Sequence, residues 1–147
     1  MTRTVRVGLA LLAVALVIVL ARPAARYAHS AALLARVGGQ GGAWAARAAG
    51  LIETTVTTRA AVIPTRTGTL RGRIYMPDRV RTRPLLLTGG VHAQGIDEPR
   101  LAGLARHLAA HGTPVITPEL PDLLSYRITP RLPSQIEDAA QWVISTR

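Results

Sequence analysis

The sequence predicts an α/β domain in which an antiparallel hairpin precedes a parallel strand–helix–strand unit, with a transmembrane helix N-terminal to both. Residues 84–122 indicate the strand–helix–strand unit, because two short apolar runs flank a glycine-rich turn and a helical apolar pattern. The β-prone residues 54–76 indicate the hairpin, and the uncharged residues 7–21 indicate the transmembrane helix. We therefore expect three parts: a membrane anchor or signal sequence over 1–22, an alanine- and glycine-rich juxtamembrane helix and linker over 23–52, and the α/β domain over 53–147.

The apolar run at 7–21 lies between Arg6 and Arg22, and as a helix it spans about 22 Å against roughly 30 Å of hydrocarbon. Both arginine side chains can reach toward the headgroups and close most of that gap. We expect a single-pass membrane anchor with lipid as its partner, in an orientation left open by arginines on both flanks. The same pattern fits a signal peptide cleaved near 28–30, followed by export, and a buried soluble helix is a third interpretation.

Positive charge is concentrated in the first part of the chain. The net charge is +10, with 13 arginines against two acids in 1–83 and five against six in 84–147. Such a region suits either nucleic acid or anionic lipid headgroups. The neighbouring apolar run favours lipid, and an aromatic content of 3% leaves few rings for stacking on bases, so we expect no nucleic-acid partner.

The hairpin is predicted from strands near 54–58 and 70–76, joined by a turn at 67–69. Polar and apolar side chains alternate along 70–76, which predicts a half-buried strand near a sheet edge. One face would hold Leu70, Gly72, Ile74 and Met76, and the other Arg71, Arg73 and Tyr75. The arginines at 71, 73, 79, 81 and 83 are then expected to form a solvated face and loop.

The strand–helix–strand unit begins with the leucines at 85–87, an unalternating run typical of a strand covered on both faces. Glycines at 89, 90 and 95 mark a sharp turn, and Asp97 is expected to cap the following helix. The helix would bury Leu101, Leu104, Ala105 and Leu108, end at His111-Gly112, and lead into a strand at 115–117.

The remaining residues predict a loop and a second helix. Residues 119–126 form the loop, and Ser134 with Glu137 matches a capping box that would start the helix. Its buried stripe would comprise Ile136, Ala140, Val143 and Ile144, with Trp142 also in the core.

No cofactor or metal site is predicted. The glycines at 89, 90 and 95 lack the G-x-G-x-x-G spacing of a dinucleotide-binding turn, and Ile96-Asp97 stands where a P-loop requires lysine and a hydroxyl residue. His107 and His111 have helical metal-ligand spacing but no third ligand, and there is no cysteine. His92 has no acid spaced to orient it, so we assign it no catalytic role.

The order of hairpin, strand, glycine turn, helix, strand, loop and capped helix resembles the N-terminal half of an α/β-hydrolase, over about 54–147. The most specific part is GVHAQGIDEPR at 90–100, which looks like membrane-anchored bacterial relatives of the dienelactone-hydrolase and esterase type. TPELPD at 117–122 resembles the loop after their fourth strand. The resemblance implies a partial, truncated α/β-hydrolase sheet.

The resemblance also implies an oxyanion hole at the glycine turn. The backbone N–H of Val91 would face the developing oxyanion, and Gly90 would let the backbone approach it. Relatives of this kind usually carry His-Gly where this chain has Gly89-Gly90, so the imidazole that braces the turn is absent.

The serine nucleophile of the resembled family lies in G-x-S-x-G, and none of Ser30, Ser125, Ser134 and Ser145 has that context. No catalytic residue is therefore assigned. The resemblance implies an inactive N-terminal fragment of a serine hydrolase, whose full-length relative would cleave a small-molecule acyl ester or lactone. The alternative is a non-enzymatic, membrane-anchored binding protein with a small α/β domain.

Overall fold

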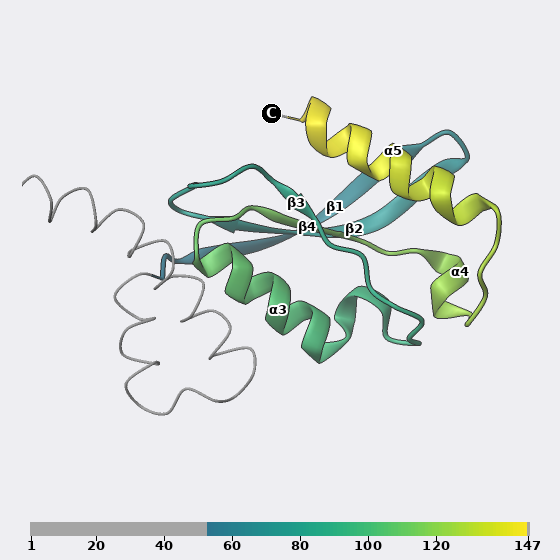
Figure 1. The fold of residues 1–147 in the computed structure, drawn as a ribbon, viewed down its shortest axis with the longest axis horizontal. Coiled ribbons are helices and arrows are strands. Elements are labelled where there is room, and N and C mark those ends of the chain that lie inside the picture. The colour runs from purple at the N-terminus through teal and green to yellow at the C-terminus, as the bar shows by residue number, and fades with distance from the viewer. Residues whose placement is uncertain (1–52, 147) are drawn as a thin grey trace, which may run out of the picture. The chain divides into compact units, whose positions relative to one another are not determined.

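The computed structural model describes residues 53–146, so the predicted anchor and linker over 1–52 lie outside the described residues (Figure 1). Within the described part, none of the helices has the length and apolarity needed to cross a membrane. The elements in chain order are the strands and helices β1 (Val56–Thr65), β2 (Gly68–Pro77), β3 (Leu85–Leu86), the 3-10 helix η1 (Gly95–Asp97), α3 (Pro99–Ala110), β4 (Val115–Pro118), α4 (Pro121–Leu124) and α5 (Arg131–Ser145).

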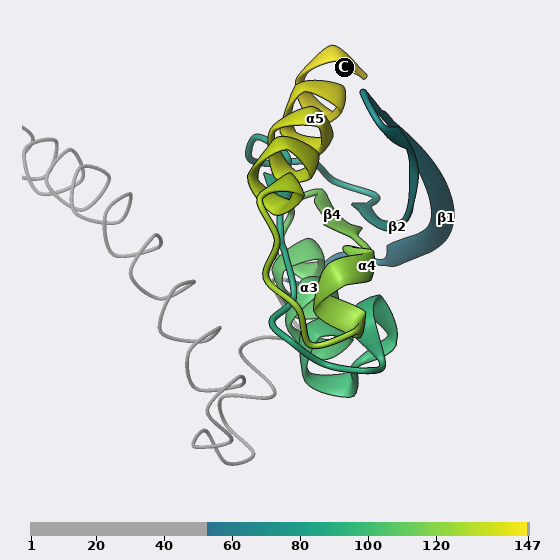
Figure 2. The same cartoon turned by 90° about the vertical axis from the view of Figure 1, so that its right-hand side faces the viewer.

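The four strands form one mixed sheet in the order β1-β2-β4-β3. β1 and β2 pair antiparallel along their whole length, from Val56 opposite Pro77 to Thr65 opposite Gly68. β2 pairs antiparallel with β4, and β4 pairs parallel with β3 through α3. The predicted hairpin and the predicted parallel strand–helix–strand unit are both confirmed, and Figure 2 shows the long hairpin bent around one side of the domain.

Helices cover the sheet on two faces, α5 above and α3 below β4 in Figure 1. Because successive strand residues point to opposite faces, the neighbours Ile74 and Tyr75 enter different cores. The core under α5 contains the buried residues Ile63, Leu70, Ile74, Ile116, Leu120 and Ala139. The core under α3 contains Tyr75, Ala105, Ala109 and Val115.

Strand 70–76 was predicted to lie near a sheet edge, and β2 is the second strand of the sheet, between the edge strand β1 and β4. Tyr75, expected on the solvated face, is 0% exposed and packs under α3. The leucine run at 85–87 is covered on both faces, as predicted, because Leu86 packs against the core under α5 and Leu87 against the core under α3. Leu85 is 37% exposed, and β3 is the last strand of the described sheet, which was not predicted. Sheet order depends on long-range pairing, which the local alternation does not encode.

Both helix starts differ from the predicted ones. α3 begins at Pro99 and is capped by Glu98, so the predicted cap Asp97 belongs instead to η1. α5 begins at Arg131, so Ser134 lies inside the helix. Pro133 sits in the first turn of α5, where its missing N–H costs no helical hydrogen bond, and this allows the earlier start.

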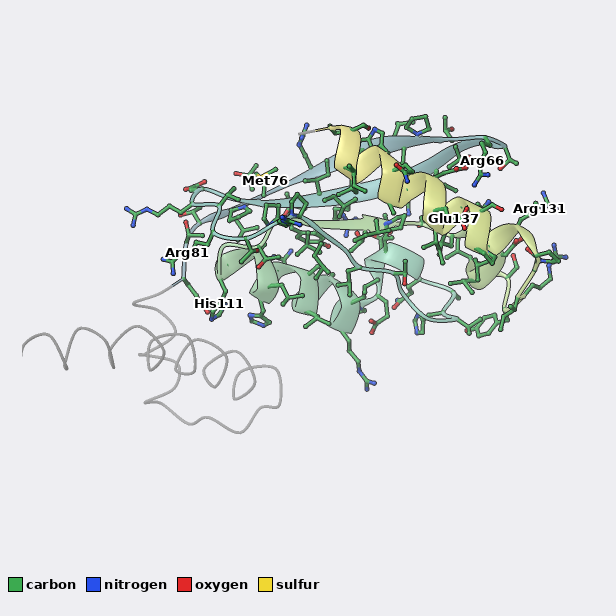
Figure 3. The ribbon with its side chains drawn as sticks, turned by 45° about the horizontal axis from the view of Figure 1, so that its top comes forward. Arg66, Met76, Arg81, His111, Arg131 and Glu137 are labelled. Atoms are coloured by element: carbon green, nitrogen blue, oxygen red, sulfur yellow. The ribbon has the colours of Figure 1, made fainter. Side chains whose placement is uncertain are left out.

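Glu137, the other half of the predicted capping box, forms an ion pair with Arg66 in the β1–β2 turn, at 3.1 Å (Figure 3). The same guanidinium bonds Asp138 through Nε at 2.7 Å, and the Arg66 backbone N–H also donates to Asp138. α5 is thereby fastened to the tip of the hairpin. Its buried stripe uses Ala139 rather than Ile144, which is 57% exposed.

Candidate oxyanion site

A pocket of about 650 Å³ opens where the chain leaves the carboxyl end of β3. The glycine turn forms one wall and the first two turns of α3 form the other. The lining residues are Leu87, Thr88, Gly89, Gly90, Val91, His92, Gly95, Glu98, Arg100, Leu101 and Leu104. The two residues predicted for the oxyanion hole, Gly90 and Val91, therefore lie side by side in the wall of a cavity large enough for a small ligand.

The glycines of this turn serve different purposes. A Cβ on Gly90 would meet no atom within 4 Å, so the packing around the turn does not require glycine at this position. Gly95 has φ +51, and a Cβ there would lie 2.6 Å from Leu124 Cδ2 and 3.2 Å from Glu119 Oε2. At Gly95 glycine is needed both for a left-handed backbone and for close packing against α4.

The backbone amides of Gly90 and Val91 donate no hydrogen bond to any residue that the structure describes. Backbone hydrogen bonds resume on both sides, from Leu87 N–H to the Ile116 carbonyl at 2.8 Å and from Gly95 N–H to the His92 carbonyl at 3.0 Å. Most backbone N–H groups in folded proteins have a protein or water partner. The six backbone N–H groups from Thr88 to Ala93 all lack a partner within the described part of the chain. Those of Gly90 and Val91 are exposed and belong to the pocket wall, where they can donate to water or to a ligand.

Few charged side chains line the pocket, and one of them, Glu98, already forms hydrogen bonds within the fold. The Glu98 carboxylate accepts from the backbone N–H groups of Arg100, at 3.0 Å, and Leu101, at 2.6 Å. These hydrogen bonds, the one from Arg100 first, lower the pKa of Glu98. Glu98 therefore stays ionised as the N-cap of α3 and is unsuited to donate a proton.

A network of four charged side chains holds η1 against β2. Arg71 forms a bidentate pair with Glu119, at 2.9 Å and 2.6 Å, and reaches Asp97 at 3.1 Å. Arg73 bonds the other oxygen of the Asp97 carboxylate and donates to the Ile96 carbonyl at 3.3 Å. Of the arginines predicted as a solvated face, Arg71 is 59% exposed and Arg73 is 29% exposed, and both also hold the segment that follows the glycine turn.

The Asp97 pair gives a pH-dependent prediction. The hydrogen bond from Arg73 is the main cause that lowers the pKa of Asp97 from its ordinary 3.8. A lowered folded pKa adds stability above pH 3.8, and this stability is lost as the pH falls through the folded value. We expect Asp97→Asn to lower the free energy of unfolding at pH 7 by roughly 1 kcal/mol or less, because the carboxylate is half exposed.

The difference between wild type and Asp97→Asn should shrink toward pH 2, measured by urea unfolding. Asp78→Asn is the matched control, because this exposed carboxylate forms no ion pair within the described part of the chain. A difference between wild type and Asp97→Asn that is equally large at both pH values would contradict the prediction.

The other candidate residues do not assemble into a reactive centre. His92 lines the pocket, and its Nδ1 accepts from the Gln94 N–H at 3.2 Å. His111 bonds the His107 carbonyl through Nδ1 at 2.9 Å, and no group of three metal-ligating side chains occurs among the residues described. The described serines at 125, 134 and 145 are absent from the pocket lining.

The Arg71–Arg73–Asp97–Glu119 network was missed from the sequence. The available signal was the pair of arginines two residues apart on one strand, since such side chains share a face and can meet the same partner. Their acidic partners lie 24 to 48 residues away, so spacing alone gives no sign of the pairing.

Scans of the chain against protein-family models, curated proteins and solved structures found no match.

Proposed function

We propose that the α/β domain carries the oxyanion-stabilising part of a serine α/β-hydrolase that cleaves acyl esters or lactones, attached to a membrane by the anchor predicted over 1–22. The observation that carries this proposal is the pair of unbonded amides at Gly90 and Val91, in the wall of a 650 Å³ pocket. Nucleophilic attack on an ester turns the carbonyl oxygen into an oxyanion. One N–H donor aimed at that oxygen lowers the barrier by about 3–4 kcal/mol.

The surroundings of the turn favour this use. Preorganised donors are effective because they need no rearrangement when charge develops. Here β3 holds the turn from one end, and the Arg73–Asp97 pair holds η1 at the other. This charged network can supply the bracing that the missing imidazole gives in the resembled family.

The nucleophile, acid and base of the proposed reaction have no counterpart in the 147 residues. We therefore propose that these residues alone do not turn over an ester, because loss of a catalytic triad costs on the order of a millionfold in rate. In a full-length relative, a serine from G-x-S-x-G would approach the pocket from outside the described elements.

Butyrate is a direct probe of the proposed donors, because its carboxylate has the oxygen atoms of a hydrolysed acyl ester. We expect titration of the ¹⁵N-labelled full chain in detergent micelles to shift the Gly90 and Val91 amide resonances saturably, while equal chloride leaves them in place. Shifts confined to the exposed arginines, or no shift at the turn, would overturn the proposal.

Val91→Pro removes the N–H donor itself, whereas Val91→Ala keeps it and shortens the side chain. We expect proline to weaken butyrate binding at least tenfold, since a hydrogen bond to a charged group contributes roughly 1.5–3 kcal/mol. Alanine should change the dissociation constant less than about twofold, because Val91 is 45% exposed and its side chain is not packed. Equal losses in the two variants would show that the side chain, and not the amide, holds the ligand.

The non-enzymatic alternative makes a different prediction. Translating the DNA 3′ of codon 147 in its three forward frames should reveal a G-x-S-x-G motif if the hydrolase proposal is correct. Absence of that motif, together with a turn that does not respond to butyrate, would favour a binding protein.

A further inference from the structure

The loop at 125–130, between α4 and α5, exposes apolar side chains that neither core uses. Tyr126 is 66% exposed and Ile128 is 82% exposed, the highest value among the large exposed hydrophobic side chains described. Single exposed apolar residues are common on soluble proteins. Here an aromatic and an aliphatic side chain stand two residues apart on one short loop.

The loop is held in this arrangement by an uncommon backbone. Tyr126 has φ 54, and it is the one non-glycine residue in the left-handed region within 53–146. Such a conformation is rare for a bulky residue and persists only where neighbouring contacts impose it. Asp122 supplies these contacts, because its backbone carbonyl accepts from the Arg127 N–H at 2.8 Å and its carboxylate bonds the Thr129 hydroxyl.

The charge on the loop is positive. Arg127 and Arg131 are exposed and flank Ile128, and Figure 3 shows Arg131 at the outer end of α5, away from the sheet. No acid occurs between Asp122 and Glu137. Asp122 is largely covered and reaches Arg127 only at 4.0 Å, so the arginine remains available to a partner.

We propose that residues 125–131 form a contact surface for an anionic lipid bilayer. Tyr126 and Ile128 would enter the interface between headgroups and acyl chains, where aromatic and aliphatic side chains are favoured. Arg127 and Arg131 would pair with anionic headgroups, each adding attraction at the surface. The surface uses residues other than those of the anchor predicted over 1–22, and the inference does not rest on the proposed hydrolase activity.

The loop lies next to residues that contact the glycine turn, so a bilayer bound to the loop would be near the pocket. The loop follows α4, whose Leu124 packs on Gly95 and, with Leu123, lines a small cavity shared with Gly89 and Gly90. A bilayer that binds 125–131 would therefore lie close to the glycine turn. An acyl compound dissolved in the membrane would then be the ligand class nearest to the pocket.

The chain has no cysteine, so a single introduced thiol can carry an environment-sensitive fluorophore. We would label Ile128→Cys and Val62→Cys with a nitrobenzoxadiazole dye in the full chain, reconstituted in phosphatidylcholine vesicles with or without phosphatidylglycerol. Val62 is a matched control, because it is also an exposed aliphatic residue, at 69%, but lies on β1.

We expect the label at 128 to shift to the blue and lose most of its quenching by iodide on vesicles that contain phosphatidylglycerol. The label at 62 should stay accessible to iodide. A label at 128 that remains accessible overturns the lipid assignment and leaves the loop to a protein partner. Equal protection at both positions overturns it as well, because the loop would then not be the contact.

Removing both charges separates headgroup recognition from apolar insertion. Arg127→Gln combined with Arg131→Gln should weaken binding of the loop to anionic vesicles on the order of tenfold or more, since each arginine near the surface contributes roughly fivefold. Arg106→Gln, an exposed arginine on α3, should leave it unchanged. Protection at 128 that does not depend on phosphatidylglycerol or on the two arginines would contradict recognition of anionic lipid.

Discussion

Replacing Ile74 by alanine is expected to lower the free energy of unfolding by about 2–5 kcal/mol, the range for large-to-small changes in a packed core. Ile74 is 5% exposed and packs with Ile63, Leu70 and Ile116 under α5. It lies on β2, which pairs with β1 on one side and with β4 on the other. A cavity at Ile74 is therefore expected to weaken packing next to both of these strands. Because domains are stable by only about 5–15 kcal/mol, the loss should be visible in urea unfolding followed by circular dichroism.

Ile144→Ala is the matched control, since it is the same substitution at a position that is 57% exposed on α5. The change there should stay within about 0.5 kcal/mol, as for most surface substitutions. The helical pattern in the sequence had predicted that Ile144 is buried. Comparing the two variants therefore also tests whether Ile144 is exposed, as the structure shows. Similar losses of unfolding free energy in the two variants would mean that Ile144 is buried and that α5 packs on the sheet with a different face.

The sequence was sufficient to predict the hairpin, the parallel strand–helix–strand unit and the approximate bounds of α3. These elements follow from local patterns: turn residues near 67–69, glycines before the helix and apolar spacing along it. The order of strands was not predictable in this way. β4 pairs with β2 as well as with β3, and the apolar run that forms β4 carries no mark of its second neighbour.

The helix starts were predicted wrongly for a related reason. Ser134 and Glu137 match a capping box, but the helix begins about one turn earlier, and Glu137 pairs with Arg66. Arg66 is 71 positions away in the sequence, so the local motif gives no sign of this pairing.

Gly90 and Val91 were predicted as oxyanion-hole residues from a resemblance in the glycine turn, and the structure places both in the wall of a pocket of about 650 Å³. Their oxyanion role stays a prediction. The ion pairs that Asp97 forms with Arg71 and Arg73 could not be predicted from the sequence. The fold determines which charged side chains come together.

Gly95→Val is expected to have the largest effect at the site itself. Valine at φ +51 has an unfavourable backbone, at about 1–2 kcal/mol, and overpacking against neighbours commonly adds about 1–3 kcal/mol. The Leu124 side chain can move aside in part, but Glu119 is held by its bidentate pair with Arg71. We therefore expect a total loss of roughly 2–5 kcal/mol in urea unfolding.

Gly90→Val separates stability from ligand binding, because the same side chain is added five residues earlier in open space. Its stability should change by less than about 0.5 kcal/mol. Both variants should nevertheless lose the amide shifts that butyrate produces at the turn, Gly95→Val by displacing the turn and Gly90→Val by placing a branched side chain on a residue that lines the pocket. If Gly90→Val binds butyrate as the wild type does, the ligand does not bind next to Gly90. If Gly95→Val is as stable as the wild type, the left-handed turn packed on Leu124 is not the conformation in solution.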